Sequence, residues 1–239
     1  MNASERPKWS WIARLYFWLA ERLYHELAWV YDPVSWLVSL GHWDAARKSA
    51  LDYVGSGRVL ELGFGTGELL LEMRRRGLDA CGLDASPQMQ RVTRRKMRRS
   101  GLWAALVQGS AQRMPFASGS FDCLLATFPS GYILEPETWL EAARVLHPAP
   151  IQPSPLPLST DLRSQPGSGG AGRLIVVGVL VLRGRKEPDN GQNLLGGQVW
   201  EQVHQRFQEL ASLSGLRLSL EMRRFGRVTL PILIAERLS

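Results

Sequence analysis

Hydrophobic and polar positions follow two alternating periodicities along residues 43–239. Short apolar runs bounded by glycine, serine or aspartate predict five strands, in "SGRVLELGF", "LDACGLDAS", "WAALVQGS", "SFDCLLATF" and "GRLIVVGVLVL". Helical spacing predicts helices at 43–54, in "GELLLEMRRRG", over Pro87–Arg99, in "PETWLEAARVL" and near 197–214. Strands and helices that alternate in this way predict an α/β, doubly wound, Rossmann-like sheet with mostly parallel strands.

Two segments modify this plan. "LRLSLEMRRF" and "RVTLPILIAERL" are separated only by a short turn, which predicts a C-terminal antiparallel hairpin at the sheet edge. Residues 148–171 are rich in proline, serine and glycine and lack periodicity, which predicts a disordered insertion before the fifth strand. We expect this insertion to lie away from any ligand site at the carboxyl ends of the strands.

The first 42 residues have a different pattern. Residues 9–31 predict a helix with a narrow polar line and a wide apolar, aromatic surface. Six of the nine tryptophans come before residue 44. We therefore predict an N-terminal helical lid or substrate region at 1–42 and a main domain at 43–239. The alternative is a helix that lies on a membrane surface, because tryptophan favours that interface.

Composition narrows the class of protein only in part. The 239 residues suffice for one α/β domain, and Cys81 and Cys123 lie in apolar, strand-like runs. This predicts buried, reduced thiols in a cytoplasmic protein and neither a disulfide nor a metal site. No apolar run is long enough to span a bilayer, and the first residues are not typical of a signal peptide. The net charge of +7 is compatible with nucleic acid, an anionic membrane or an acidic substrate.

The glycine-rich segment "VLELGFGTGELL" carries the main candidate site. A triphosphate loop needs lysine and then serine or threonine directly after its last glycine, and this segment has neither at those positions. A dinucleotide loop that starts at Gly63 needs a third glycine at the position of Glu68, whose carboxylate would repel a pyrophosphate. The spacing therefore favours a tight turn around a ligand without phosphate.

Two carboxylates suggest what that ligand contains. Glu61 ends the first strand and can bind a cation, while Asp84 ends the second strand, where an acid accepts ribose hydroxyls. Each acid alone is equally compatible with a helix cap. Together with the glycines they favour a nucleoside with an ammonium group and a sulfonium centre, which is S-adenosylmethionine.

Four segments, "VLELGFGTG", "GLDAS", "GSAQRMPFASGSFD" and "EAARVLHP…GRLIVV", resemble the class I S-adenosylmethionine-dependent methyltransferase family in order and spacing. "YDPVSWLVSLGHW" resembles the entry helix of its UbiE-like (methyltransferase type 11) branch, which acts in ubiquinone and menaquinone biosynthesis. The resemblance implies a methyltransferase for a hydrophobic or amphipathic small molecule, such as a quinone precursor or a lipid-like acceptor. It implies S-adenosylmethionine as cofactor and no metal.

The resemblance also implies site residues. The implied cofactor contacts are Glu61, Gly63, Phe64, Gly65, Gly67, Asp84, Ala85, Ser110, Ala111 and Thr127. Many relatives carry aspartate where this chain has Ser110, so recognition of the adenine amino group is expected to be weaker. Met114 is expected to cover the adenine, and Phe128 and Pro129 are expected at the rim where cofactor and acceptor meet.

No residue stands out as a general base. The candidates are Tyr31, Asp32, His42 and Tyr132, and for each a structural role is the alternative: a turn or cap for the aspartate, a surface position for the histidine and pocket walls for the tyrosines. "TFPSGYI" differs from the motif of enzymes that methylate amino groups of nucleic-acid bases. Those enzymes have a polar residue at the position of Phe128, so this class is disfavoured.

A basic helix at 91–100 keeps a second function open. Its arginines suit an RNA-binding methyltransferase or a non-catalytic RNA-binding relative, and a solvated helix face is the alternative. A third possibility is a membrane-peripheral protein in which this helix and the tryptophan-rich N-terminal helix both contact anionic lipid.

Overall fold

The computed structural model describes residues 42–149, 170–178, 182–183, 197–225 and 228–238. The predicted N-terminal aromatic helices and most of the predicted insertion lie outside these residues. The described elements, in chain order, are α3 (His42–Ser49), η1 (Ala50–Tyr53), β1 (Arg58–Leu62), α4 (Glu68–Arg75), β2 (Asp79–Asp84), α5 (Pro87–Arg99), β3 (Leu106–Gln108), β4 (Cys123–Thr127), η2 (Gly131–Leu134), α6 (Pro136–Val145), β5 (Arg173–Val177), β6 (Leu182–Arg183), α7 (Gly197–Leu213), β7 (Leu216–Phe225) and β8 (Val228–Arg237).

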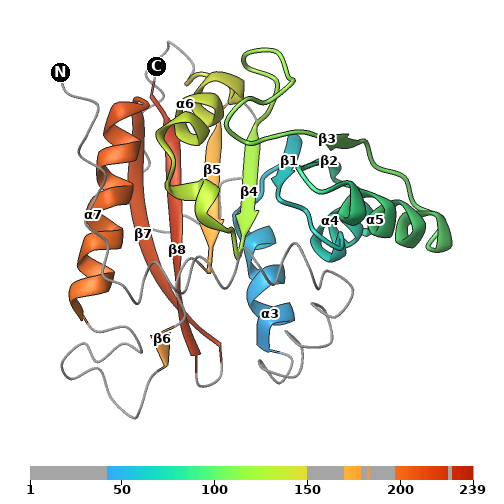
Figure 1. Cartoon of the computed structure of the whole chain (residues 1–239), viewed down its shortest axis with the longest axis horizontal. Coiled ribbons are helices and arrows are strands. Elements are labelled where there is room, and N and C mark those ends of the chain that lie inside the picture. Colours follow the sequence, from blue (N-terminus) through green and yellow to red (C-terminus); the bar gives the residue numbers. More distant parts are fainter. Residues whose placement is uncertain (1–41, 150–169, 179–181, 184–196, 226–227, 239) are drawn as a thin grey trace.

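The strands form one sheet in the order β3-β2-β1-β4-β5-β8, and β6 and β7 also pair with β8 (Figure 1). β1 to β5 are parallel, whereas β8 runs antiparallel to β5, β6 and β7. The order reverses between β1 and β4, and in sheets of this kind ligands bind at that point, beyond the carboxyl ends of the strands. The predicted doubly wound sheet with a C-terminal hairpin is confirmed.

Helices cover both faces of the sheet. One apolar cluster joins the sheet to α6 and α7 and includes Trp139 and Phe207, while the other joins it to η1, α4 and α5. Successive strand residues alternate between the two clusters, so Leu60 and Leu62 of β1 face α6 and α7 and Val59 faces the opposite side. This alternation places Glu61 on the same side as Val59, toward the start of α4.

The fifth strand is shorter than the apolar run "GRLIVVGVLVL" predicts. β5 ends at Val177, opposite Ile232, and β6 pairs Leu182 with Thr229, so four residues on one side correspond to two on the other. Gly178 has a φ of 78°, and Pro231 of β8 has no N–H to donate to the ladder. The prediction of one continuous strand is therefore wrong, and the interruption coincides with these two residues.

Both ends of the predicted insertion lie at the amino ends of the strands. The Gly172 N–H donates to the carbonyl of His147 over 3.0 Å, and the His147 N–H donates to the carbonyl of Phe121 over 2.8 Å. These contacts precede β4 and β5. The glycine turn follows β1, so the insertion leaves and re-enters the fold at the opposite end of the sheet.

Candidate functional site

The glycine-rich segment forms a tight turn between β1 and α4. The Gly63 N–H continues the ladder by donating to the Leu83 carbonyl over 2.8 Å. Gly67 has a φ of 77°, and a Cβ there would lie 2.3 Å from Cγ2 of Thr93. A Cβ on Gly63, with a φ of 66°, would lie 3.0 Å from the Tyr132 hydroxyl. Glycine is required at both positions because the left-handed backbone and the close approach each exclude a side chain.

Asp84 holds this turn from the end of β2. Its carboxylate is buried and accepts the N–H of Gly65 and the N–H of Ser86, each over 2.8 Å. Ser86, not Asp84, is the N-cap of α5 and accepts the N–H of Met89. A carboxylate offers about four acceptor sites, so one group can fix the turn and also accept hydroxyl groups of a ligand.

Glu61 is the second buried acid of the site. Its side chain is 2% exposed, and its Oε2 has no hydrogen-bond partner within the described part of the chain. Burial raises the pKa of Glu61 to about 8; Arg47 and the backbone amide of Leu70 lower this pKa, and Asp84 raises it. Leu70 lies in the first turn of α4, where backbone amides lack helical partners. A cation at Oε2 would stabilise the carboxylate and so offset the desolvation that raises this pKa.

These groups fit the predicted cofactor. A buried carboxylate oxygen without a partner suits an ammonium group, since burying an unpaired polar atom is costly. Asp84, on the neighbouring parallel strand, suits the hydroxyls of a ribose, and the glycine turn between the two acids lets backbone approach a ligand closely. Glu68 begins α4 directly after the turn, and its carboxylate would repel a phosphate group at this helix N-terminus.

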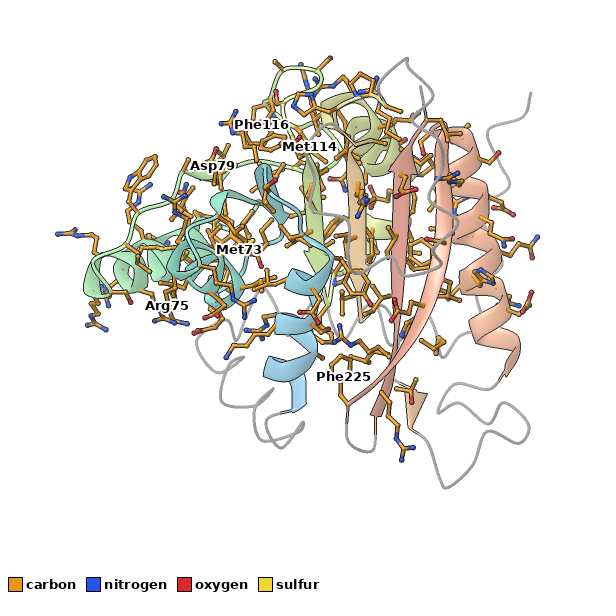
Figure 2. The ribbon with its side chains drawn as sticks, turned by 180° about the vertical axis from the view of Figure 1, so that it is seen from behind. Met73, Arg75, Asp79, Met114, Phe116 and Phe225 are labelled. Carbon is orange, nitrogen blue, oxygen red and sulfur yellow. The ribbon has the colours of Figure 1, made fainter. Side chains whose placement is uncertain are left out.

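The predicted adenine contacts follow β3. The Gly109 N–H donates to the Asp84 carbonyl over 3.1 Å, which places the next two residues beyond Asp84. Ser110 is exposed and its hydroxyl contacts the side chain of Gln112, while Ala111 is 9% exposed at the edge of the core. Met114 is buried in the core beside α6, and its N–H donates to Glu141 over 2.7 Å (Figure 2).

The predicted rim begins where β4 ends at Thr127. Phe128 has a φ of 50°, which is unfavourable for a residue with a bulky side chain, and its N–H donates to the Val177 carbonyl over 2.7 Å. A Cβ on Gly178 would lie 2.2 Å from the Phe128 ring, so the ring packs directly on that glycine. Strained residues of this kind cluster at ligand sites, and Pro129 continues this rim.

Of the candidate bases, the structure places only Tyr132 in the described site. Its hydroxyl donates to the Leu62 carbonyl over 3.0 Å, and burial, Asp84 and Glu61 raise its pKa well above the usual value. A phenol in this environment stays protonated, so it is a donor and a wall rather than a base. Tyr31 and Asp32 lie outside the described residues, and His42 begins α3 with a side chain that is not described.

Three residues of the site have no clear signal in the sequence. Thr93 of α5 is fully buried and its Oγ1 donates to the Gly65 carbonyl over 2.8 Å. Gly82 of β2 leaves room for the Phe64 ring, which a Cβ would approach to 2.5 Å. Arg47 of α3 interacts with Glu61. These pairings depend on the packing of elements that are distant in sequence.

Thr93 provides a test of how the turn is held. We expect Thr93→Val to lower cofactor affinity by about tenfold and stability by about 1–3 kcal/mol, because it leaves the buried Gly65 carbonyl without a donor. Thr93→Ser keeps the hydroxyl and removes only the methyl group near Gly67, so its affinity should stay within about twofold. Calorimetric titration and thermal unfolding measure both effects. Equal losses in the two variants would contradict the positioning role.

Cys81 and Cys123 are buried, free thiols, as predicted, and burial raises their pKa to about 11 and about 12. No group of three or more histidine, cysteine, aspartate or glutamate side chains is placed to hold a metal ion in the described ranges. Nor does any helix in those ranges have the length and apolar character to cross a membrane.

Comparison with known proteins supports this interpretation. Residues 59–149 match the methyltransferase domain family. The chain is 33% identical over 132 residues to demethylmenaquinone methyltransferase of Thermus thermophilus, covering 53% of this chain and 60% of that protein. It is 30% identical over 140 residues to the ubiquinone/menaquinone biosynthesis C-methyltransferase UbiE of Yersinia enterocolitica, covering 54% and 55%. The alignments thus span little more than half the length of these curated relatives.

Solved structures agree with the fold. A SAM-dependent methyltransferase from Aquifex aeolicus superimposes with a TM-score of 0.55 at 16% identity, covering 83% of this chain and 92% of that one. Geranyl diphosphate C-methyltransferase from Streptomyces coelicolor, solved with S-adenosyl-L-homocysteine, superimposes with a TM-score of 0.56 at 12% identity, covering 81% and 79%. These likenesses show the fold, while the match of residues 59–149 to the methyltransferase domain family and the curated relatives support the predicted family and its S-adenosylmethionine cofactor.

Proposed function

We propose that this chain is a UbiE-like class I S-adenosylmethionine-dependent methyltransferase that methylates a hydrophobic or amphipathic small molecule. The observation that carries the proposal is the pair of buried acids, Glu61 and Asp84, on either side of the glycine turn. The names of the quinone-biosynthesis relatives support a quinone precursor or another lipid-like molecule as acceptor.

We assign the cofactor contacts as follows. Glu61 binds the ammonium group, Asp84 binds the ribose hydroxyls, and the turn at Gly63, Phe64, Gly65 and Gly67 surrounds the methionine part. Ala85 flanks the ribose, Ser110 and Ala111 contact the adenine, and Thr127 lies beside the reacting end. The absence of a phosphate-binding pattern and the unpartnered Oε2 of Glu61 support this assignment.

When bound, S-adenosylmethionine supplies an electrophilic methyl group on a sulfonium whose leaving group is neutral. The chain therefore has to bind and orient the cofactor and the acceptor and to keep water out. It has less need to stabilise new charge. Glu61 and Asp84 fix the two ends of the nucleoside. Phe128 forms an apolar wall at the rim. Tyr132 forms a second wall and is a hydrogen-bond donor rather than a base, because its phenol is hydrogen-bonded and protonated. We propose residues 1–42 as the lid that completes the acceptor pocket.

The acceptor class can be tested with methyl-labelled cofactor. The protein is incubated in parallel with a lipid extract that contains quinone precursors and with total RNA, and the products are partitioned between water and organic solvent. We expect the label in the organic phase, and none with Asp84→Ala in the same assay. Label that enters RNA, with none in the organic phase, would contradict the proposed acceptor class.

A further inference from the structure

One face of α5 carries an unusual concentration of positive charge. Met89, Thr93 and Met97 are buried at intervals of four residues and fix the inward side of the helix. Val92 is half-buried. The opposite side is an arc of about 140° at 3.6 residues per turn. It carries five exposed arginines, which we call the arginine face: Arg91, Arg94, Arg95, Arg98 and Arg99.

The protein does not neutralise this charge within its described residues. The α5 sequence contains no acidic residue, and within the described ranges Lys96 of α5 pairs with Glu68 of α4. None of the five arginine side chains forms an ion pair or hydrogen bond in that part of the chain. Like charges three and four residues apart destabilise a helix, so this arrangement is unfavourable until an anion binds.

The five side chains of the arginine face also lie close to one another. They alone line one shallow surface depression. Figure 2 shows nitrogen-tipped side chains that project outward from this end of the molecule, where α4 and α5 lie. Guanidinium groups bind phosphate oxygens through paired hydrogen bonds, so several phosphates can be held at once.

Trp103 is an exposed apolar side chain four residues after Arg99 in the chain. It follows the end of α5 and is 73% exposed, and it is the one exposed large aromatic side chain among the described residues. Tryptophan favours the boundary between lipid headgroups and acyl chains. RNA sites instead combine several aromatic side chains with a basic groove, and the described residues expose a single large aromatic ring.

We propose that the arginine face and Trp103 form a docking surface for an anionic phospholipid membrane. The arginines contact the headgroup phosphates and Trp103 enters the interface, so α5 lies along the surface of the bilayer. The proposal is independent of the identity of the methyl acceptor, because it rests on α5 and not on the cofactor site.

Co-sedimentation with vesicles tests this surface. Vesicles of phosphatidylcholine with one third phosphatidylglycerol are compared with pure phosphatidylcholine vesicles at ~0.1 M salt. We expect binding only to the anionic vesicles. The triple variant Arg91→Gln, Arg95→Gln, Arg98→Gln should lose about 100-fold in partitioning, at the usual contribution of each basic residue near an anionic surface. Trp103→Ala should lose several-fold on the same vesicles.

A charge-matched control separates the surface from net charge. Lys48→Gln, Arg217→Gln, Arg224→Gln removes the same three charges from α3 and β7 and should lose less than about threefold. Equal losses in the two triple variants would overturn the proposal, as would an unchanged partitioning of the α5 variant. A titration with single-stranded RNA at the same salt concentration tests nucleic acid as the alternative anionic partner. Tighter binding to RNA than to vesicles, lost in the α5 variant, would overturn the lipid assignment.

Discussion

Asp84→Ala is expected to weaken cofactor binding at least about 100-fold. Asp84 is assigned the ribose hydroxyls, and hydrogen bonds to a charged group contribute about 1.5–3 kcal/mol each. The same carboxylate accepts the Gly65 and Ser86 amides, so its removal also releases the glycine turn. Calorimetric titration with S-adenosylhomocysteine measures the loss, and circular dichroism checks the fold. Asp84→Asn, which keeps the size of the side chain, should still lose about tenfold or more.

Asp79→Ala is the matched control on the same strand. Asp79 begins β2 at the opposite end, and its side chain is 75% exposed, within 4.0 Å of Arg58 and Arg74. Exposed ion pairs contribute little to stability, so this variant should bind the cofactor as the unaltered protein does. An affinity of Asp84→Ala within threefold of the unaltered protein would contradict the ribose assignment.

The elements of the site that could be predicted from sequence share one property. Glu61, Asp84 and the glycines between β1 and α4 lie at the carboxyl ends of parallel strands, and these ends meet at one edge of the sheet. The order of strands and helices therefore brings them together without knowledge of any single contact. The C-terminal hairpin could be predicted because only a short turn separates its two apolar runs.

What the sequence did not reveal depends on packing between distant segments. Thr93 is an ordinary helix residue until α5 packs against the turn and its hydroxyl reaches Gly65. Gly82 is an ordinary strand glycine until the Phe64 ring lies over it. The end of β5 did have a signal, because Gly178 and Pro231 stand opposite each other, but apolar residues on both sides of Gly178 suggest a continuous strand. Backbone strain at Phe128 has no signal in composition or periodicity.

The pKa of Glu61 predicts how cofactor binding depends on pH. With a pKa of about 8, Glu61 is protonated at pH 7 in the cofactor-free protein, and binding an ammonium group requires its carboxylate form. Binding should therefore release about one proton at pH 7, and affinity should rise about tenfold per unit between pH 5.5 and pH 7.5. Above about pH 8 affinity should fall again, because the amino group of the ligand itself loses its proton.

The same shift has a consequence for stability. The folded protein retains a proton that the unfolded chain loses above about pH 4.5, so the free energy of unfolding of the cofactor-free protein should decrease as pH rises from 4.5 to about 8. Below that window the contribution is fully present, and above it the contribution is lost. Glu61→Gln removes the titrating group and should flatten this decrease, which makes the variant more stable than the unaltered protein at pH 8.

Glu61→Gln should nevertheless bind S-adenosylhomocysteine about 10- to 100-fold more weakly at pH 7.5, because a neutral amide replaces the charged partner of the ammonium group. Calorimetry in two buffers with different ionisation enthalpies measures proton release, which should vanish in this variant. Glu68→Gln is the control: Glu68 starts α4 beside the turn but pairs with Lys96, so proton release and affinity should persist. If Glu61→Gln kept both the affinity and the proton release, Glu61 could not be the group that binds the ammonium, and the raised pKa would reflect burial alone.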